Sequence, residues 1–167
     1  MPRDASPIRL YLFDADDTLR RTRVPRQPSP RAPGEWELLP GVAARLRAMP
    51  WGPHDLLLGV ASNQDQVGYG LVTVRAAHQL LMDMIQAATG IAPPAEAVTL
   101  CPHRLETPCA CRKPAAGMLL RIMTFYGVSP EETLFVGNAP TDHEAARRAG
   151  TRFAWARDFF ALAEERR

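Results

Sequence analysis

Three short apolar runs divide the chain, and each run is followed by polar residues. The runs cover residues 8–13, 55–61 and 133–136. Runs of this length and composition are typical of strands that are buried on both faces of a sheet. Weaker strand patterns occur at residues 97–100 and 152–155.

Helical patterns lie between these runs. The clearest covers residues 115–126, where apolar residues recur at i, i+3, i+4 and i+7, and Gly127 stands where the helix would end. Residues 42–49, 72–88 and 141–149 show further helical patterns, the last with Thr141 as N-cap. Strands that alternate with helices predict an α/β fold, with a Rossmann-like parallel sheet and helices on both faces. In such folds a ligand binds at the carboxyl ends of the strands, where the strand order reverses.

Length and composition are typical of one globular domain over residues 1–167. The chain is long enough to bury a core, and 46% of its residues are hydrophobic and 23% charged. No apolar run approaches the length of a membrane span, and the N-terminus has no apolar signal-peptide segment. We therefore expect a cytoplasmic protein. We also expect it to be a monomer. The net charge of +2 is too small to imply nucleic-acid binding from bulk electrostatics.

Two aspartates follow directly on the first run. Asp14 and Asp16 are two residues apart, so both carboxylates can face one cavity if the backbone is extended. Such a pair suits a nucleophile and a general acid/base, with a cation to offset their repulsion. An Asp-x-Asp after a strand is also common as a helix cap or a turn.

The other strand ends carry groups that complement these carboxylates. Ser62 and Asn63 can donate hydrogen bonds to an anion, and Lys113, the only lysine in the chain, adds a positive charge. Asn138 and Asp142 bring oxygen ligands of the kind that Mg²⁺ prefers. Each group alone could belong to a simple loop. Their shared placement at the ends of predicted strands is what indicates a functional site.

All three cysteines lie in one segment, residues 101–114. Cys101, His103, Cys109 and Cys111 supply three thiolates and one imidazole, a complete tetrahedral set for Zn²⁺. The alternatives are chance clustering and a disulfide. Three is an odd number, and a reducing cytoplasm favours metal binding over a disulfide. Because the set leaves no open coordination position, the zinc would be structural.

A basic, proline-rich segment at residues 20–36 follows the two aspartates. Its first part contains no acidic residue but five arginines, namely Arg20, Arg21, Arg23, Arg26 and Arg31. The prolines predict an irregular loop, which could cover the substrate as a flap. A basic flap would favour a polyanion such as a sugar bisphosphate or a nucleic-acid end. The alternative is a solvated loop in an arginine-rich chain.

Over roughly residues 8–155 the chain resembles the haloacid-dehalogenase-like (HAD) phosphatases, in which four such motifs occur in this order. The resemblance implies that Asp14 attacks phosphorus to form an aspartyl-phosphate. It implies that Asp16 protonates the leaving oxygen and later activates water. Ser62 and Asn63 would bind the phosphoryl oxygens, and Lys113 would offset their charge.

The same resemblance implies cofactor and substrate contacts. A Mg²⁺ ion would lie between Asp14, the backbone carbonyl of Asp16 and Asn138, with Asp142 adjacent. Thr18 and Arg112 are the substrate-binding candidates, Arg112 for a second anionic group. The zinc segment looks like that of the small branch without a large cap domain, which contains the histidinol-phosphatases and the heptose 1,7-bisphosphate phosphatases. A small phosphorylated metabolite of either kind is therefore the expected substrate, with a nucleic-acid 3′-end as the alternative.

Two positions depart from the pattern of the family. Asn138 stands where the family usually has a metal-binding aspartate, so Mg²⁺ binding should weaken. Asp17 replaces a common glycine and adds a charge beside the nucleophile. A phosphate-binding module with impaired catalysis is therefore a further alternative.

Overall fold

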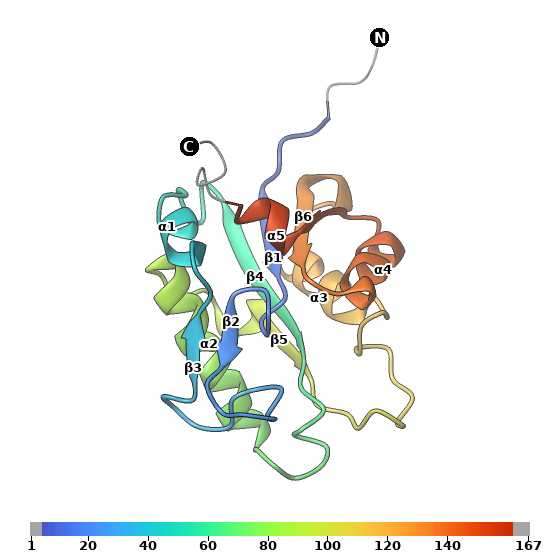
Figure 1. Ribbon diagram of the computed structural model, residues 1–167. Helices are drawn as coiled ribbons and strands as arrows, with labels where there is room; N and C mark the ends of the chain where they lie inside the picture. The colour runs from blue at the N-terminus through green and yellow to red at the C-terminus, as the bar shows by residue number, and fades with distance from the viewer. Residues whose placement is uncertain (1–4, 162–167) are drawn as a thin grey trace.

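The computed structural model describes residues 5–161 (Figure 1). Within this range the main sheet has five parallel strands in the order β5-β4-β1-β6-β7. In chain order they are β1 Leu10–Phe13, β4 Leu57–Asn63, β5 Val98–Cys101, β6 Thr133–Gly137 and β7 Arg152–Trp155. All five predicted strands are present, with ends within two residues of the expected positions.

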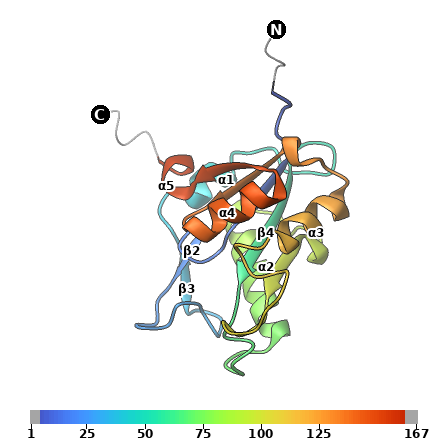
Figure 2. The same ribbon diagram turned by 90° about the vertical axis from the view of Figure 1, so that its right-hand side faces the viewer.

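Helices cover both faces of the sheet (Figures 1 and 2). One face packs against α1, α2 and α5 and the other against α3 and α4. Their bounds are α1 Val42–Leu46, α2 Val74–Thr89, α3 Gly117–Tyr126, α4 Pro140–Ala149 and α5 Ala156–Phe159. The Rossmann-like α/β prediction is thus confirmed. Among residues 5–161, no helix has both the length and the apolar character needed to cross a membrane.

The central strand β1 explains why its sequence is apolar without alternation. Leu10 and Leu12 are fully buried against the α3 and α4 side, whereas Phe13 is fully buried on the α1 and α2 side. A strand covered on both faces needs apolar residues at every position. The same strand is where the order reverses, because β4 and β5 lie on one side of it and β6 and β7 on the other. Its carboxyl end is therefore the place where a ligand is expected.

The flap is more regular than predicted. Residues 20–36 were expected to form an irregular loop, but strands β2 Arg20–Thr22 and β3 Trp36–Leu38 pair as an antiparallel hairpin. A cross-strand ion pair joins Arg21 Nε to Glu37 Oε1 at 2.7 Å. Strands of three residues are too short to show periodicity, so only the loop between them was recognisable from its prolines. The flap is inserted between β1 and α1, and within residues 5–161 no larger cap domain accompanies it.

Helix α4 begins earlier than predicted. Its N-cap is Ala139 rather than Thr141, and Pro140 occupies the first turn, where a missing N–H has no cost. Ala139 has no side-chain acceptor. Instead, Asp142 Oδ2 accepts hydrogen bonds from the backbone N–H groups of Asn138, at 3.0 Å, and Ala139, at 3.1 Å. An aspartate of the predicted site thus caps the helix that carries it.

Candidate active site

The carboxyl ends of β1, β4 and β6 surround a cavity of about 240 Å³. Most of the predicted site residues line it: Asp14, Asp16, Ser62, Asn63, Lys113, Asn138 and Asp142. Residues of the flap, of the neighbouring loops and of the start of α4 complete the lining: Asp17, Pro28, Ser29, Asp65, Gln66, Ala139 and Thr141. A larger and mostly apolar cavity of about 610 Å³ adjoins it at Asp17 and Asn138. The titratable groups converge on the smaller cavity, so we place the candidate active site there.

A buried ammonium lies between two carboxylates at the base of this cavity. Lys113 Nζ is 2.6 Å from Asp14 Oδ1 and 2.7 Å from Asp142 Oδ1, and the lysine side chain is 3% exposed. Burial lowers the pKa of Lys113, but the two carboxylates outweigh this effect and raise it. The ammonium is therefore charged, and it joins the end of β1 to the start of α4.

The pKa of Asp14 reflects both its burial and the charges around it. The pKa of Asp14 is raised to about 6, mainly by burial and further by the carboxylates of Asp142 and Asp16, although Lys113 opposes them. Asp14 and Asp142 thus share the Lys113 ammonium. The second oxygen of Asp14, Oδ2, accepts a hydrogen bond from Thr18 Oγ1 at 3.0 Å.

Thr18 and Asn138 lie beside the nucleophile candidate. Besides Asp14, the Thr18 hydroxyl contacts Asn138 Oδ1 at 3.3 Å, so the amide oxygen of Asn138 faces the Asp14 side of the cavity. The structure thus gathers Asp14, Asn138 and Asp142 as a group of oxygen donors. This is the ligand type that Mg²⁺ requires.

Ser62 and Asn63 end the strand β4 but play different structural parts. Ser62 is buried, and its Oγ accepts a hydrogen bond from Gln64 Nε2 at 2.8 Å, which leaves the Ser62 hydroxyl hydrogen available to an anion. The side chain of Asn63 is engaged at both ends by the backbone of Lys113. Its Nδ2 donates to the Lys113 carbonyl at 3.1 Å, and its Oδ1 accepts from the Lys113 N–H at 3.0 Å. Asn63 therefore positions Lys113.

Asp16 is held by partners that sequence reasoning missed. Its Oδ1 accepts from Arg20 Nε at 2.8 Å, and its Oδ2 accepts from Ser29 Oγ at 2.6 Å and from Gln64 Nε2 at 2.9 Å. Arg20 is only 1% exposed although it lies in the basic segment, and it also donates to the carbonyl of Leu80. Nothing in the local sequence distinguishes this buried arginine from its solvated neighbours.

Asp17 adopts the left-handed backbone conformation, with φ of 63°. This conformation explains why glycine is common at such a position, because only glycine enters it without steric cost. Aspartate tolerates it better than most other residues. Burial and the neighbouring Asp16 carboxylate raise the pKa of Asp17.

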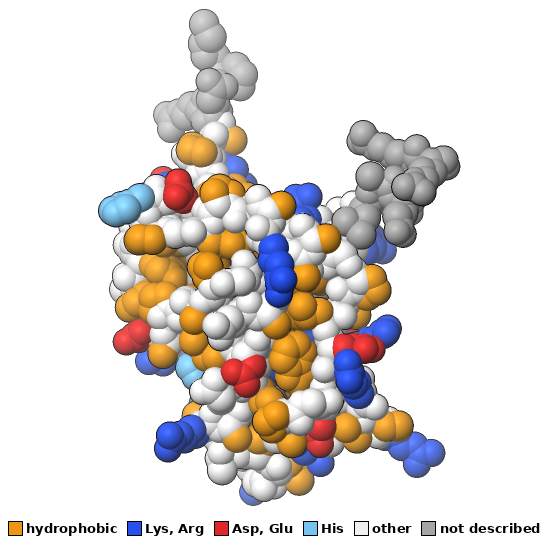
Figure 3. Space-filling model, turned by 90° about the vertical axis from the view of Figure 1, so that its left-hand side faces the viewer, with side chains coloured by type: hydrophobic (Ala, Val, Ile, Leu, Met, Phe, Trp, Pro, Cys, Tyr) orange, Lys and Arg blue, Asp and Glu red, His pale blue; other side chains and the backbone are white. Residues whose placement is uncertain are grey.

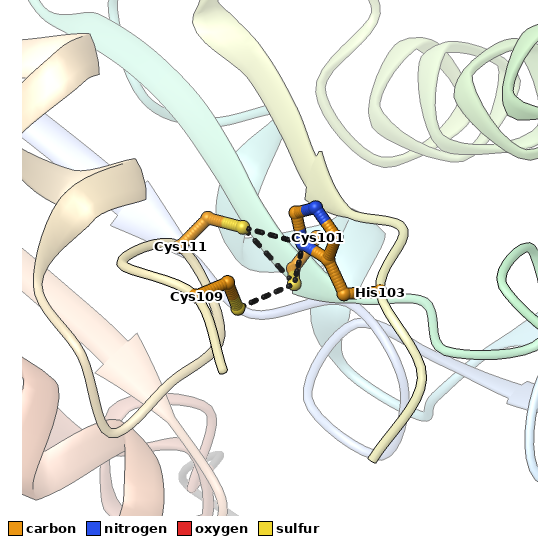
Figure 4. A group of neighbouring side chains, drawn as sticks. All are labelled: Cys101, His103, Cys109 and Cys111. Atoms are coloured by element: carbon orange, nitrogen blue, oxygen red, sulfur yellow. Dashed lines mark hydrogen bonds between the residues drawn. The ribbon is translucent and has the colours of Figure 1, made fainter. Parts of the chain in front are cut away.

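The four predicted zinc ligands form one cluster (Figure 4). Their ligand atoms all lie within 4.8 Å of one another, and Cys101 comes from the end of β5. The sulfur atoms of Cys101 and Cys111 are 3.1 Å apart, and those of Cys101 and Cys109 are 3.7 Å apart. These separations exceed the S–S bond length of about 2.05 Å, and all three cysteines are free. No disulfide joins these three cysteines, and the donor set suits Zn²⁺.

The thiols of the cluster differ in environment. A hydrogen bond from the backbone N–H of Arg112 lowers the pKa of Cys109 to about 6, whereas burial raises the pKa of Cys101 to about 12. Arg112 itself donates from Nη2 to the carbonyl of His103 at 2.7 Å. Its guanidinium thus stabilises the loop that carries the four ligand candidates. Arg112 is not among the residues that line the 240 Å³ cavity.

Comparison with known proteins agrees with this geometry. A HAD-hydrolase-like family model matches residues 110–158. A D-glycero-beta-D-manno-heptose-1,7-bisphosphate 7-phosphatase of Bordetella bronchiseptica is 32% identical over 126 residues, which cover 72% of this chain and 66% of that protein. One of the same name from Pseudomonas aeruginosa is 34% identical and covers 68% of this chain and 62% of its own length. The chain belongs to the HAD-like family.

Solved structures support the HAD-like assignment. The D,D-heptose 1,7-bisphosphate phosphatase of B. bronchiseptica, complexed with magnesium and phosphate, aligns with a TM-score of 0.65 and 29% identity, covering 87% of this chain and 79% of that one. A HAD-like phosphatase of Mesorhizobium loti aligns with a TM-score of 0.64 over 92% of this chain and 74% of its own, but at 21% identity it supports the fold alone. The chain spans slightly less than two thirds of the length of the two heptose-bisphosphate phosphatases compared above.

Gly137, the last residue of β6, leaves the space that the Asp142 side chain occupies. A Cβ at this position would lie 2.5 Å from Asp142 Cβ and 2.6 Å from its Oδ2. We expect Gly137→Ala to displace the Asp142 carboxylate from Lys113 and to lower the free energy of unfolding by about 1–3 kcal/mol, measured by urea denaturation. Gly52→Ala is the control, because its Cβ would meet only Asp55 Oδ2 at 3.6 Å. Equal stability of the two variants would contradict the conclusion that Asp142 needs a glycine at position 137.

Proposed function

We propose that the chain is a Mg²⁺-dependent phosphatase that hydrolyses a small phosphorylated metabolite through an aspartyl-phosphate. The observation that carries the proposal is the buried contact of Lys113 with Asp14 and Asp142, which faces Ser62 and Asp16 across one cavity. Phosphoryl transfer depends mainly on positioning and on charge stabilisation. This arrangement supplies both.

The proposed reaction has two steps. A carboxylate oxygen of Asp14 attacks phosphorus, the bond from phosphorus to the alcohol oxygen breaks, and Asp16 gives a proton to that oxygen. Asp16 then takes a proton from water as the water attacks the aspartyl-phosphate, which releases inorganic phosphate and restores Asp14. Lys113 offsets the charge of the phosphoryl oxygens, and the Ser62 hydroxyl donates to one of them.

The oxygen donors at the site fit Mg²⁺. Asp14, Asn138 and the backbone carbonyl of Asp16 would hold the ion, with Asp142 adjacent. Burial and the neighbouring carboxylates raise the pKa of Asp14, and a cation would offset both effects. When bound, Mg²⁺ supplies charge stabilisation for the phosphoryl group.

The curated relatives favour heptose 1,7-bisphosphate as the substrate, and histidinol phosphate remains the second choice. The nucleic-acid alternative has less support. Arg20 is buried against Asp16, and both Arg21 and Arg23 pair with Glu37, so part of the flap charge is already offset. On the face drawn in Figure 3, basic side chains are interspersed with acidic ones rather than gathered in a continuous patch.

Phosphate release tests the proposal. With Mg²⁺ present, we expect the protein to release phosphate from heptose 1,7-bisphosphate faster than from histidinol phosphate or from a 3′-phosphorylated oligonucleotide. Asp14→Asn removes the nucleophile, so it should abolish release while retaining the fold, as judged by circular dichroism. If no substrate and no aryl phosphate is hydrolysed, the result would favour the alternative of a phosphate-binding module with impaired catalysis. Preference for the oligonucleotide would establish the nucleic-acid alternative.

The neutral side chain of Asn138 should limit Mg²⁺ affinity. Asn138→Asp adds a charged ligand, and we expect it to strengthen Mg²⁺ binding about tenfold or more, measured by calorimetry. In the unmodified protein the metal competes with a proton for Asp14, whose pKa is about 6. Affinity should therefore fall about tenfold per pH unit below pH 6 and level off above it. Binding that is equally strong at pH 5 and pH 7 would contradict Asp14 as a ligand.

The cysteine and histidine cluster should bind one structural zinc ion. We expect about one equivalent of zinc in protein purified without chelator, and a lower midpoint of thermal unfolding after the zinc is removed. Cys109→Ser should lose zinc, whereas Thr107→Ser, an exposed change in the same loop, should keep it. A zinc content below about half an equivalent in the unmodified protein would contradict the four-ligand site.

A further inference from the structure

The flap reaches the general acid candidate through a buried hydrogen-bond network. Ser29 of the flap donates from Oγ to Asp16 Oδ2 at 2.6 Å, which is among the shortest contacts of the site. Two glutamines after β4, Gln64 and Gln66, complete the network. The exposed fractions are 8% for Ser29, 1% for Gln64 and 5% for Gln66. These three buried polar side chains take no part in the ion pair of Asp14 with Lys113. Their burial therefore needs a separate explanation.

Two flap groups fix the orientation of the Gln66 amide. The carbonyl of Pro30 can only accept, and Gln66 Nε2 donates to it at 3.1 Å. The guanidinium of Arg31 can only donate, and its Nε faces Gln66 Oε1 at 3.3 Å. Both partners require the same orientation of the amide. The flap therefore determines which end of Gln66 faces Gln64.

Gln66 in turn orients Gln64. Its Nε2 donates to Gln64 Oε1 at 2.9 Å, so the amide nitrogen of Gln64 must face the other way. That nitrogen donates to Asp16 Oδ2 at 2.9 Å and to Ser62 Oγ at 2.8 Å. A chain of hydrogen bonds with one direction thus runs from the flap to the carboxyl group of Asp16.

Three segments converge on this one carboxyl group. Arg20 Nε on β2 holds Oδ1, whereas Ser29 and Gln64 both hold Oδ2. Arg20 and the oriented Gln64 can only donate. The Ser29 hydroxyl donates as well, so all three groups stabilise the carboxylate that remains when Asp16 gives up its proton.

We propose that Ser29 is a positioning residue, by which the flap holds the carboxyl group of Asp16 in line with the leaving oxygen. The proposal rests on the phosphatase function proposed above. In the step concerned, the bond from the carboxyl oxygen of Asp16 to its proton breaks and a bond from that proton to the leaving oxygen forms. The electron pair stays on the Asp16 carboxylate, which Ser29, Gln64 and Arg20 then stabilise. Gln66 contributes through Gln64.

The experiment compares aryl and alkyl phosphate esters. Alkoxides are poor leaving groups and need the proton from Asp16, whereas p-nitrophenolate leaves with little help. We would measure kcat/KM with Mg²⁺ for p-nitrophenyl phosphate, phenyl phosphate and glycerol 2-phosphate, because kcat/KM covers the steps up to departure of the alcohol and excludes hydrolysis of the aspartyl-phosphate. Ser29→Ala should lower kcat/KM about 10- to 100-fold for the alkyl ester but less than about threefold for p-nitrophenyl phosphate.

Matched variants separate positioning from a structural effect. Ser29→Thr keeps the hydroxyl and should regain most of the loss. Gln27→Ala removes a flap hydrogen bond to Glu35, of 2.8 Å, that does not touch Asp16, so it should leave the ratio of alkyl to aryl rates unchanged. The midpoint of thermal unfolding of each variant reports the fold.

The outcomes distinguish failure of this inference from failure of the function. If Ser29→Ala slows all esters by the same factor, or if Gln27→Ala shows the same selective loss, Ser29 does not act through Asp16 and the inference is wrong. If the unmodified protein hydrolyses none of the esters, the phosphatase function itself fails and the inference fails with it. A loss selective for alkyl esters that Ser29→Thr restores supports the inference.

Discussion

The contact of the Lys113 ammonium with two buried carboxylates is the interaction on which the site depends. It joins Asp14 at the end of β1 to Asp142 in the first turn of α4, two elements that are far apart in the sequence. Removing one partner of a buried ion pair typically costs about 3–5 kcal/mol, because an uncompensated charge is left behind. A lysine suits this place, since a compact ammonium fits between two carboxylates better than the planar fork of an arginine. Asn63 holds the backbone of Lys113 from the neighbouring strand.

Much of the site could be predicted because parallel strands bring their carboxyl ends to one edge. Asp14, Ser62 and Asn138 each follow an apolar run, so their convergence depends only on strand positions, and strand positions are visible in the sequence. The clustering of the three cysteines with His103 was predictable for a different reason. Cys101 and Cys111 are ten residues apart, so a single loop brings the ligands together whatever the rest of the fold does.

The surroundings of Asp16 could not be predicted, because they depend on which way individual side chains point. Arg20 and Arg31 look alike in the sequence, yet one is fully buried against Asp16 while the other orients Gln66. Prolines identified the flap as a loop, but its pairing as a hairpin depends on strands too short to leave a periodic pattern. The hydrogen bonds of Asn63 to the Lys113 backbone could not be predicted either. An asparagine after a strand can bind an anion or hold a neighbouring backbone segment, and the sequence does not distinguish the two.

The two departures from the family pattern offset each other in charge. Asparagine at position 138 removes one negative charge relative to aspartate, and aspartate at position 17 adds one relative to glycine. Both residues line the 240 Å³ cavity and the larger cavity beside it, so they contribute to the same electrostatic environment. Burial, and after it the neighbouring Asp16 carboxylate, raise the pKa of Asp17. The formal charge of the cavity lining is therefore the same as with glycine and aspartate at these positions. What differs is the position of the negative charge. It lies on Asp17 and not on residue 138, whose side chain is connected to Asp14 through the Thr18 hydroxyl.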